Sequence, residues 1–598
     1  MKNIVFIVVF VVFAAVIAVN MPNKQVQVKV VNNPVGPVRV DESLTPAGLN
    51  LNEKHAVIAE AYAALDSEFG KNANPPKEFP IISNYHKVFI TFIGDNQIRC
   101  CQSGKGKDTD SNPGQVDIST ATERCIGDSR FGGETKRSEI NDTEITATYL
   151  YNKREIKGGL SAAKKKIELG VHSFEIAQGS DNAYYKASVA IKSNLSHKKA
   201  LKKLCKKAGL SKTCYDEPGT KINIYDTVEF KGNRKGEIVD LSRQNILFDV
   251  SEISEDMIND RVLLSRDWFK NNINHKTGLL EYMYYPSDDE YSDDNNHVRQ
   301  LATLWGVATM RNHLNDSSLN NLISKSLDYY LEYIKCEDDY CYLEIKDTSK
   351  LAYSAFMIMA LLEAKEYPNS ADLREKFAKG VLNQQEADGS YRTYFNSDRN
   401  SGANFYPGEA MLAIMMHYQD TKDEKYKTSV ENAFPYYRKY WRKGKNTAFI
   451  PWHTQVYRLL YEENKNKELA EFIFEMTDWM IKTQQALASP YEDEIGGFPP
   501  LEPRYSTSVY VEGLNDAYVV ARLIGDKTRE AKYKDSVLKA LRFILLTQYI
   551  PENSFYLKNP EKAIGGFRKT LTNNEQRIDY VQHAVFALLK ALENGVLE

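Results

Sequence analysis

Two glutamates near the starts of strongly apolar segments could carry acid and base chemistry in this 598-residue chain. Glu409 lies in "YPGEAMLAIMMHYQD" and Glu512 in "YVEGLNDAYVVARLIG". Glycoside hydrolysis needs two carboxylates, one that protonates the leaving oxygen and one that activates water or attacks the sugar. This pair is therefore the minimum that glycoside hydrolysis would require, provided that the fold brings the two carboxylates together.

Two histidines at equivalent positions, His453 and His583, allow a second chemistry. In a polysaccharide lyase or a sugar epimerase, a histidine or tyrosine takes the proton next to a uronate carboxylate that an arginine holds. Arg299 would be that arginine, and Asp579 is a further catalytic candidate. Other polar or aromatic residues at these segment starts are predicted to bind the sugar: Asn296, Tyr406, Trp452, Tyr510 and Gln582.

Each of these residues also has a plain structural interpretation. Glu409, Glu512 and Asp579 could cap their helices, where a carboxylate contributes about 0.3–1 kcal/mol. Capping would not require Arg299, Trp452, His453 or His583, so we expect a polar cavity. Without a working acid and base, the same cavity would belong to a glycan-binding or scaffold protein.

A repeat of about 50 residues after position 255 must position these side chains. Five polar loops line up, each between an amphipathic helical segment with aromatic residues and a more apolar one: "NHKTGLLEYMYYP" from Asn274, "CEDDYCYLEI" from Cys336, "QQEADGSY" from Gln384, "YEDEIGGFPP" from Tyr491 and "PEKAIGGFRK" from Pro560. Six of the more apolar segments are present. Paired helices cannot bury their apolar faces alone, so the pairs must stack on one another.

Six such hairpins that close on themselves give an α/α toroid, and residues 255–598 resemble the six-hairpin glycosidase-like superfamily. Inner helices that are apolar nearly all round belong inside a second ring of helices. The starts of the inner helices would surround one end of a central cavity, and their positive dipole ends favour anionic or hydroxyl-rich ligands. The resemblance implies a polysaccharide or oligosaccharide as the substrate.

The first half of the chain predicts an α+β domain over residues 51–232. One helical segment, "EKHAVIAEAYAAL", accompanies short strands such as "KVFITFIG", "EITATYLY" and "HSFEIAQG". The basic segment "SHKKALKKLCKKAGL" carries an apolar stripe, so its lysines are explained as the solvated face of an amphipathic helix.

Three motifs in this half resemble the AMMECR-type domain over some 180 residues. They are "RCIGDSRFGG" from Arg124, "IELGVHSFEIAQGSDN" from Ile167 and "LKKLCKKAGLSKTCY" from Leu201. Cys125 beside Arg124 could be an activated thiolate, because a neighbouring cation lowers the pKa of a thiol, with His172 as its base. The alternative is a buried or disulfide-bonded Cys125 and a core histidine.

The N-terminus predicts export. Lys2 precedes 16 uncharged apolar residues from Ile4 to Val19, so residues 1–22 form an uncleaved signal anchor or a cleaved signal peptide. Residues 23–50, rich in proline, then predict an extended tether. The globular part is expected outside the cytoplasm, membrane-anchored, or secreted if the segment is cleaved.

Seven cysteines fit that location, because exported proteins pair them. The spacings favour local bridges, Cys205 with Cys214 and Cys336 with Cys341, and a third bridge among Cys100, Cys101 and Cys125 leaves one cysteine odd. The sequence has no CxxC pair and its ten histidines are scattered, so neither a zinc site nor a cofactor is expected. A formal net charge of -3 gives no reason to expect nucleic acid as a partner.

Overall fold

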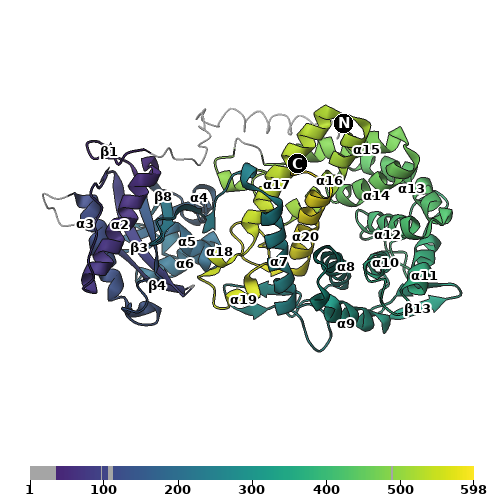
Figure 1. Cartoon of the computed structure of the whole chain (residues 1–598), viewed down its shortest axis with the longest axis horizontal. Coiled ribbons are helices and arrows are strands. Elements are labelled where there is room, and N and C mark those ends of the chain that lie inside the picture. The colour runs from purple at the N-terminus through teal and green to yellow at the C-terminus, as the bar shows by residue number, and fades with distance from the viewer. Residues whose placement is uncertain (1–35, 96, 105–111, 486–488) are drawn as a thin grey trace.

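The computed structural model describes residues 36–95, 97–104, 112–485 and 489–598. The predicted membrane segment, residues 1–22, and the tether up to residue 35 lie outside these ranges. Within them, every helix is too short or too polar to cross a bilayer. The chain forms an α+β half and a helical half that lie side by side (Figure 1).

The α+β half is built on one antiparallel sheet, whose strands follow the order β10-β9-β8-β5-β3-β4, with β6 on β8 and β7 on β6. Helices α2 and α3 pack together and share a buried core with β3 and β5. The bounds are α2 (Leu51–Glu68), β3 (Tyr85–Gly94), β4 (Gln97–Gly104), α3 (Pro113–Ile126), β5 (Glu144–Ile156), α4 (Gly159–Lys166), β6 (Ser173–Gln178), β7 (Asp181–Tyr185), α5 (Ala187–Lys192), α6 (His197–Lys207), β8 (Lys221–Gly232), β9 (Ile238–Ser242) and β10 (Asn245–Ile246). The predicted α+β class is confirmed.

Alternation along the strands decides which side chains enter the core. In β3, Val88, Ile90 and Phe92 are fully buried and belong to the core that α2 and α3 cover. The basic helix α6 buries Leu201 and Leu204 and keeps most of its lysines exposed, as its amphipathic pattern predicted.

The second part of the predicted tether is not extended away from the domain. Arg39 forms an ion pair with Glu53, with 2.7 Å between Nε and Oε1, and β1 (Ser43–Leu44) pairs with β2 (Ile81–Ile82). Leu44 is buried in the core of the α+β half. The domain therefore begins before residue 51, and the sparse apolar residues of this segment gave too weak a signal to predict it.

The helical half is a closed ring of hairpins. Each inner helix contacts the next, from α8 through α10, α12, α14 and α16 to α20, and α20 contacts α8 again. The inner helices are α8 (His297–Leu314), α10 (Leu351–Glu363), α12 (Tyr406–Thr421), α14 (Ile450–Asn464), α16 (Ser506–Ile524) and α20 (Ile578–Glu593). The predicted toroid is confirmed, and Figure 1 shows the helices around the ring.

Six outer helices accompany the inner ones: α7 (Glu255–Asn271), α9 (Asn320–Leu331), α11 (Ser370–Asn383), α13 (Glu424–Lys443), α15 (Lys467–Ile481) and α17 (Lys527–Thr547). The sequence pattern identified five of them and missed α13. Only residues 444–449 connect α13 to α14, so this hairpin lacks the long polar loop on which the repeat was recognised.

Short strands and helices decorate the ring. Strand β11 (Met283–Tyr285) pairs with β12 (Glu290–Tyr291) on one side and with β15 (Gln576–Arg577) on the other. This small sheet joins the first hairpin to the last one and places Arg577 at the start of α20. The remaining elements are β13 (Ile334–Glu337), β14 (Tyr340–Leu343), α18 (Pro551–Ser554) and α19 (Pro560–Ala563).

A buried arginine ties the two halves together. The Arg243 side chain is fully buried and pairs with Glu168 of its own half, at 2.7 Å, and with Asp493 and Glu494 of the toroid. Asn574 of the toroid also donates its side-chain amide to the carbonyl oxygen of Ile191, at 2.7 Å. The two halves therefore pack as one unit, with charged groups buried between them.

Three disulfides form, all local: Cys100–Cys125, Cys205–Cys214 and Cys336–Cys341. Cys101 is free. Both predicted pairs and the odd cysteine are confirmed.

Candidate active site in the toroid cavity

A cavity of about 430 Å³ opens where the inner helices begin. All six inner helices or the turns before them contribute to its lining. Nine of the eleven residues predicted for the toroid site line it: Asn296, Arg299, Tyr406, Glu409, Trp452, Tyr510, Asp579, Gln582 and His583. Glu512 and His453 do not.

Glu409 is a buried carboxyl group at the cavity wall. It lies in the first turn of α12, where Pro407 and the turn at Phe405 start the helix, and its side chain is 4% exposed. Burial raises its pKa to about 8, and the charge of Lys350 only partly opposes this. Its Oε2 atom has no hydrogen-bond partner among the described residues. At neutral pH Glu409 is therefore a protonated acid that can donate a proton into the cavity.

His583 is held by a buried carboxylate. Its Nδ1 lies 2.6 Å from Oε1 of Glu512, whose side chain is 1% exposed. A carboxylate accepts hydrogen bonds, so we assign the proton to Nδ1 in the neutral ring, which leaves the lone pair on Nε2. Glu512, predicted as a catalytic carboxylate facing the substrate, thus lies behind His583 and orients it.

His453, the other predicted base, belongs to the core. It is fully buried, its ring stacks on that of Phe449 at 3.3 Å between centroids, and its Nδ1 donates to the Phe449 carbonyl oxygen at 2.9 Å. Burial lowers its pKa to about 3. The first turn of α14 turns Trp452 toward the cavity and His453 away from it, a difference of one residue that the sequence pattern could not resolve.

Asp579 and Arg299 form an ion pair at the cavity wall. Arg299 Nε lies 3.0 Å from Asp579 Oδ2, and Arg577 donates to the same oxygen at 2.9 Å. Arg299 also donates to the hydroxyl of Tyr282 at 2.6 Å. The guanidinium predicted to hold a uronate is therefore already occupied, and so is the carboxylate of Asp579.

Aromatic rings form much of the remaining wall. Trp452 meets the His583 ring edge to face at 6.1 Å, and the Tyr510 hydroxyl shares a hydrogen bond of 2.8 Å with Thr447. Asn296 lines the cavity and also caps α8 by accepting from the backbone N–H of Arg299. For Asn296, both interpretations are therefore correct: it caps the helix and it lines the cavity.

The sequence analysis missed four polar or aromatic lining residues at the starts of α12 and α16: Phe405, Arg504, Tyr505 and Ser506. Phe405 is 42% exposed, and Arg504 is exposed without an ion pair to any described carboxylate. Phe405 directly precedes the predicted Tyr406, and the other three lie in the turn before the predicted Tyr510. The same polar and aromatic composition in that turn was the signal that could have identified them.

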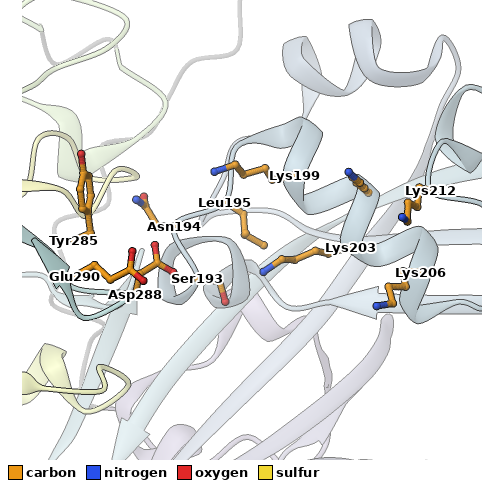
Figure 2. A pocket seen from close by; sticks show the side chains of 11 residues that line it. Ser193, Asn194, Leu195, Lys199, Lys203, Lys206, Lys212, Tyr285, Asp288 and Glu290 are labelled. Atoms are coloured by element: carbon orange, nitrogen blue, oxygen red, sulfur yellow. The ribbon is translucent and has the colours of Figure 1, made fainter. Parts of the chain in front are cut away.

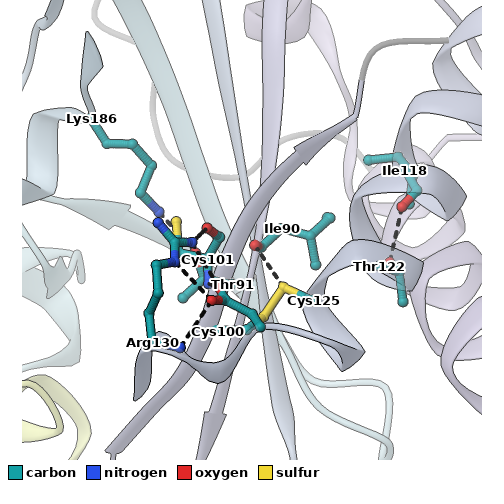
Figure 3. Close-up of a disulfide and its surroundings, with 10 residues drawn as sticks. Ile90, Thr91, Cys100, Cys101, Ile118, Thr122, Cys125, Arg130 and Lys186 are labelled. Carbon is teal, nitrogen blue, oxygen red and sulfur yellow. Dashed lines mark hydrogen bonds and ion pairs between the residues drawn. A yellow bond between two sulfur atoms is a disulfide. The ribbon is translucent and has the colours of Figure 1, made fainter. Parts of the chain in front are cut away.

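The predicted thiol site of the α+β half does not form. Cys125 is bonded to Cys100 and fully buried, so it has no thiol (Figure 3). Arg124 donates to the carbonyl oxygen of Ser103, and His172 accepts from the backbone N–H of Glu168 and lies 3.7 Å from Asp226. The alternative interpretation, a disulfide and a structural histidine, describes these residues. Across the described residues, no group of three or more potential ligands could hold a metal ion.

Comparisons with solved structures find chains that match parts of this one. An uncharacterised protein from Pyrococcus horikoshii is 22% identical and covers 32% of this chain and 97% of its own, with a TM-score of 0.28. A family 76 glycoside hydrolase from a bovine Bacteroides thetaiotaomicron strain is 11% identical over 75% of this chain and 96% of its own, with a TM-score of 0.44. A cellobiose 2-epimerase from Bacillus thermoamylovorans is 12% identical over 57% of this chain and 100% of its own, with a TM-score of 0.43.

A search of curated proteins finds no match. The family model AMMECR1 matches residues 58–230, the α+β half described above. The chain thus joins an AMMECR1 region at residues 58–230 to a six-hairpin α/α toroid.

Proposed function

We propose that the toroid cavity binds a carbohydrate and transfers protons on it, with Glu409 as the acid and His583 as the base. One observation carries this proposal: the cavity holds a protonated, unpaired carboxyl and an imidazole whose second nitrogen is fixed by a buried carboxylate. An acid and a base in one cavity, with the base oriented by a third group, are the parts that proton-transfer catalysis requires.

The walls suit a sugar. Phe405, Tyr406 and Trp452 offer aromatic faces for sugar rings, while Asn296 and Gln582 offer polar groups for hydroxyls. Oε1 of Gln582 is buried without a partner among the described residues, so it is available as an acceptor. A volume of about 430 Å³ is within the range of small-molecule pockets, which favours a short saccharide or one end of a chain.

The charges favour proton abstraction over hydrolysis. Two-carboxylate hydrolysis needs a second carboxylate that is free to activate water or attack the sugar. Glu512 is turned to His583, and Asp579 is held by two arginines. The geometry instead favours an epimerase, isomerase or lyase, in which His583 Nε2 removes a proton from the carbon next to a carbonyl or carboxylate. Glu409 then protonates the oxygen that gains charge or leaves.

We further infer that the protein works outside the cytoplasm, tethered by residues 1–22. The apolar run from Ile4 to Val19 supports this location, and so do the three disulfides, which are typical of oxidising compartments. The AMMECR1 region would then be an accessory to the toroid.

The test is solvent-exchange NMR on the soluble protein without residues 1–22. Neutral and uronate-containing saccharides are incubated in D₂O, and deuterium at the carbon next to the carbonyl or carboxylate, new epimers, unsaturated uronates and reducing ends are recorded together. We expect exchange that is lost in Glu409→Gln and His583→Asn. The exposed controls Glu332→Gln and His275→Asn should retain it.

Each other outcome leads to a different conclusion. Reducing ends without deuterium exchange would make the protein a hydrolase and contradict the assignment of His583. Saccharide binding with no turnover of any kind would make the toroid a glycan-binding scaffold.

A further inference from the structure

A second cavity, of about 660 Å³, lies between the two halves and is strongly basic. Six cations line it against one carboxylate, that of Asp288. The cations are Arg130, Lys186, Lys192, Lys203, Lys207 and Lys558. The toroid contributes Lys558 and Asp288, so the cavity is complete only when both halves are present.

Most of this positive charge is not neutralised within the protein. Arg130 pairs with Asp128, and Lys186 lies 3.8 Å from Glu229. The other four lysines form no ion pair with any described carboxylate. Lys192 lies instead against the rings of Phe555 and Tyr556, and burial, with the charge of Lys186 as a smaller cause, lowers its pKa to about 8. A concave basic surface of this kind concentrates anions.

The free thiol faces this cavity because strands alternate their side chains. Cys100 points into the core and bonds to Cys125, so its neighbour Cys101 points to the opposite face of β4. Cys101 is paired across the sheet with Thr91, whose hydroxyl accepts from Nζ of Lys186 at 2.9 Å. Figure 3 shows Cys101, Thr91, Lys186 and Arg130 together.

Ser188 is an independent sign of a ligand. This serine is 1% exposed, lines the same cavity, and has no hydrogen-bond partner for its hydroxyl among the described residues. A buried hydroxyl without a partner costs free energy that a bound acceptor would remove. Because lysines line the same cavity, an anion is the ligand that would both accept the Ser188 hydrogen bond and be attracted by the positive charge.

We propose that this cavity binds a small anion, through a phosphate or carboxylate group, beside the thiol of Cys101. A groove of about 680 Å³ shares Ser193, Lys203 and Asp288 with the cavity and carries further lysines of α6, among them Lys199 and Lys206, along its approach (Figure 2). The solvated-helix interpretation still explains the exposed lysines of α6. It does not explain Lys186 and Lys192, which lie before and at the end of α5.

The thiol provides its own probe. Iodoacetate and iodoacetamide alkylate a thiolate by the same displacement, in which an S–C bond forms and iodide leaves, but only iodoacetate is an anion. Cys101 is the single cysteine outside a disulfide, so labelling reports on this cavity alone. We expect the rate ratio of iodoacetate to iodoacetamide at low salt to exceed that of a small free thiol by at least about tenfold.

Competition and substitution sharpen the test. Inorganic phosphate or succinate should slow labelling, and the more effective of the two assigns the ligand to the phosphate or the carboxylate class. Lys192→Gln should reduce the rate ratio several-fold and Ser188→Ala should weaken the protection. Lys198→Gln, an exposed lysine of α6 outside both linings, should change neither. Circular dichroism checks that each variant is folded.

Two results would overturn the proposal. One is a rate ratio equal to that of a free thiol, with no protection by either anion in wild-type protein. The other is a thiol that neither reagent reaches in the folded protein. The test does not use the toroid site, so its outcome is independent of the proton-transfer proposal.

Discussion

The sequence identifies Glu409 as a candidate site residue, but only its surroundings in the structure explain its protonation state. Its position at the start of an apolar helix predicted a polar cavity residue. Its protonation state comes from burial, since Trp452 and Phe356 line the same cavity and the charge of Lys350 opposes the effect of burial only in part. Desolvation disfavours the charged carboxylate and keeps the acid form.

This shift predicts how stability depends on pH. Because the folded protein holds the Glu409 proton up to about pH 8 and the unfolded chain releases it near 4.5, the stabilisation is complete below pH 4.5 and is lost as the pH rises to 8. Relative to Glu409→Gln, the free energy of unfolding of wild-type protein should fall by up to about 1.4 kcal/mol per pH unit in this window. Thermal unfolding of both proteins from pH 4 to 9 measures it. Parallel curves would mean that Glu409 ionises normally.

The same proton would act in the proposed reaction. If Glu409 acts as the acid, the deuterium exchange rate should fall as the pH rises through about 8, because the donor form is then lost. Glu332→Gln should leave this limb of the pH profile in place. A rate that keeps rising above pH 8.5 would remove Glu409 from the mechanism.

In the proposed mechanism Glu512 positions His583, and substitution of Glu512 should change the orientation of His583 without changing substrate binding. In Glu512→Gln we expect kcat to fall by about 10²–10⁴ with a small change in KM, because the amide no longer fixes the tautomer of His583. Nitrogen-15 NMR of His583 gives a readout that does not depend on activity. The wild-type ring should show a proton on Nδ1 and the variant a mixture of tautomers, whereas an unchanged ring would contradict the positioning role.

At the scale of elements, periodicity predicted the toroid well. All six inner helices were identified, since α10, for example, buries twelve of its thirteen residues and reads as apolar on every face. The outer helix α13 was missed because a short connection replaces the expected loop. The sequence also could not show which first-turn residues face inward, so Trp452 and His453 could not be distinguished before their helix was placed.

Helices α12 and α14 can pack closely because residue 408 is a glycine. A Cβ atom at Gly408 would lie 2.7 Å from Cβ of Trp452 and 2.8 Å from Cε1 of His453. Gly408→Ala should therefore force the two helices apart and destabilise the protein by about 1–3 kcal/mol. Urea unfolding measures this effect.

Gly444 provides the matched control. It lies at the end of α13, and a Cβ there would meet nothing within 4 Å. Gly444→Ala should leave the urea midpoint nearly unchanged. Equal effects of the two substitutions would show that helix spacing at Gly408 is not what limits stability.

At the scale of the molecule, Arg243 decides whether the two halves behave as one. Its removal would leave Asp493, which is 1% exposed, buried without its cation. Breaking a buried pair in this way costs about 3–5 kcal/mol. In Arg243→Gln we expect calorimetry to separate one unfolding transition into two. Arg442→Gln, at an exposed pair with Glu475, should shift the transition little, and a single unshifted transition in both variants would contradict the role of Arg243.

The arrangement of the two halves was beyond the sequence. The AMMECR-type resemblance predicted the α+β domain, but the thiol candidate fell on Cys125 and the free thiol is Cys101. Neighbouring cysteines on a strand point to opposite faces, and only the strand register decides which of them meets Cys125. Likewise, the basic cavity combines residues more than 400 positions apart, such as Arg130 and Lys558, which no local pattern connects.

The closure of the ring also sets the order in which the site can be assembled during synthesis. The contact between α20 and α8 joins segments that leave the ribosome almost 300 residues apart, and α20 supplies both His583 and Asp579. Until the sixth hairpin has been synthesised, the first five therefore keep part of their apolar surface exposed to solvent. A polypeptide that stops before α20 lacks Asp579, His583 and the last wall of the cavity, so we expect incomplete products of translation to be bound by chaperones or degraded by proteases.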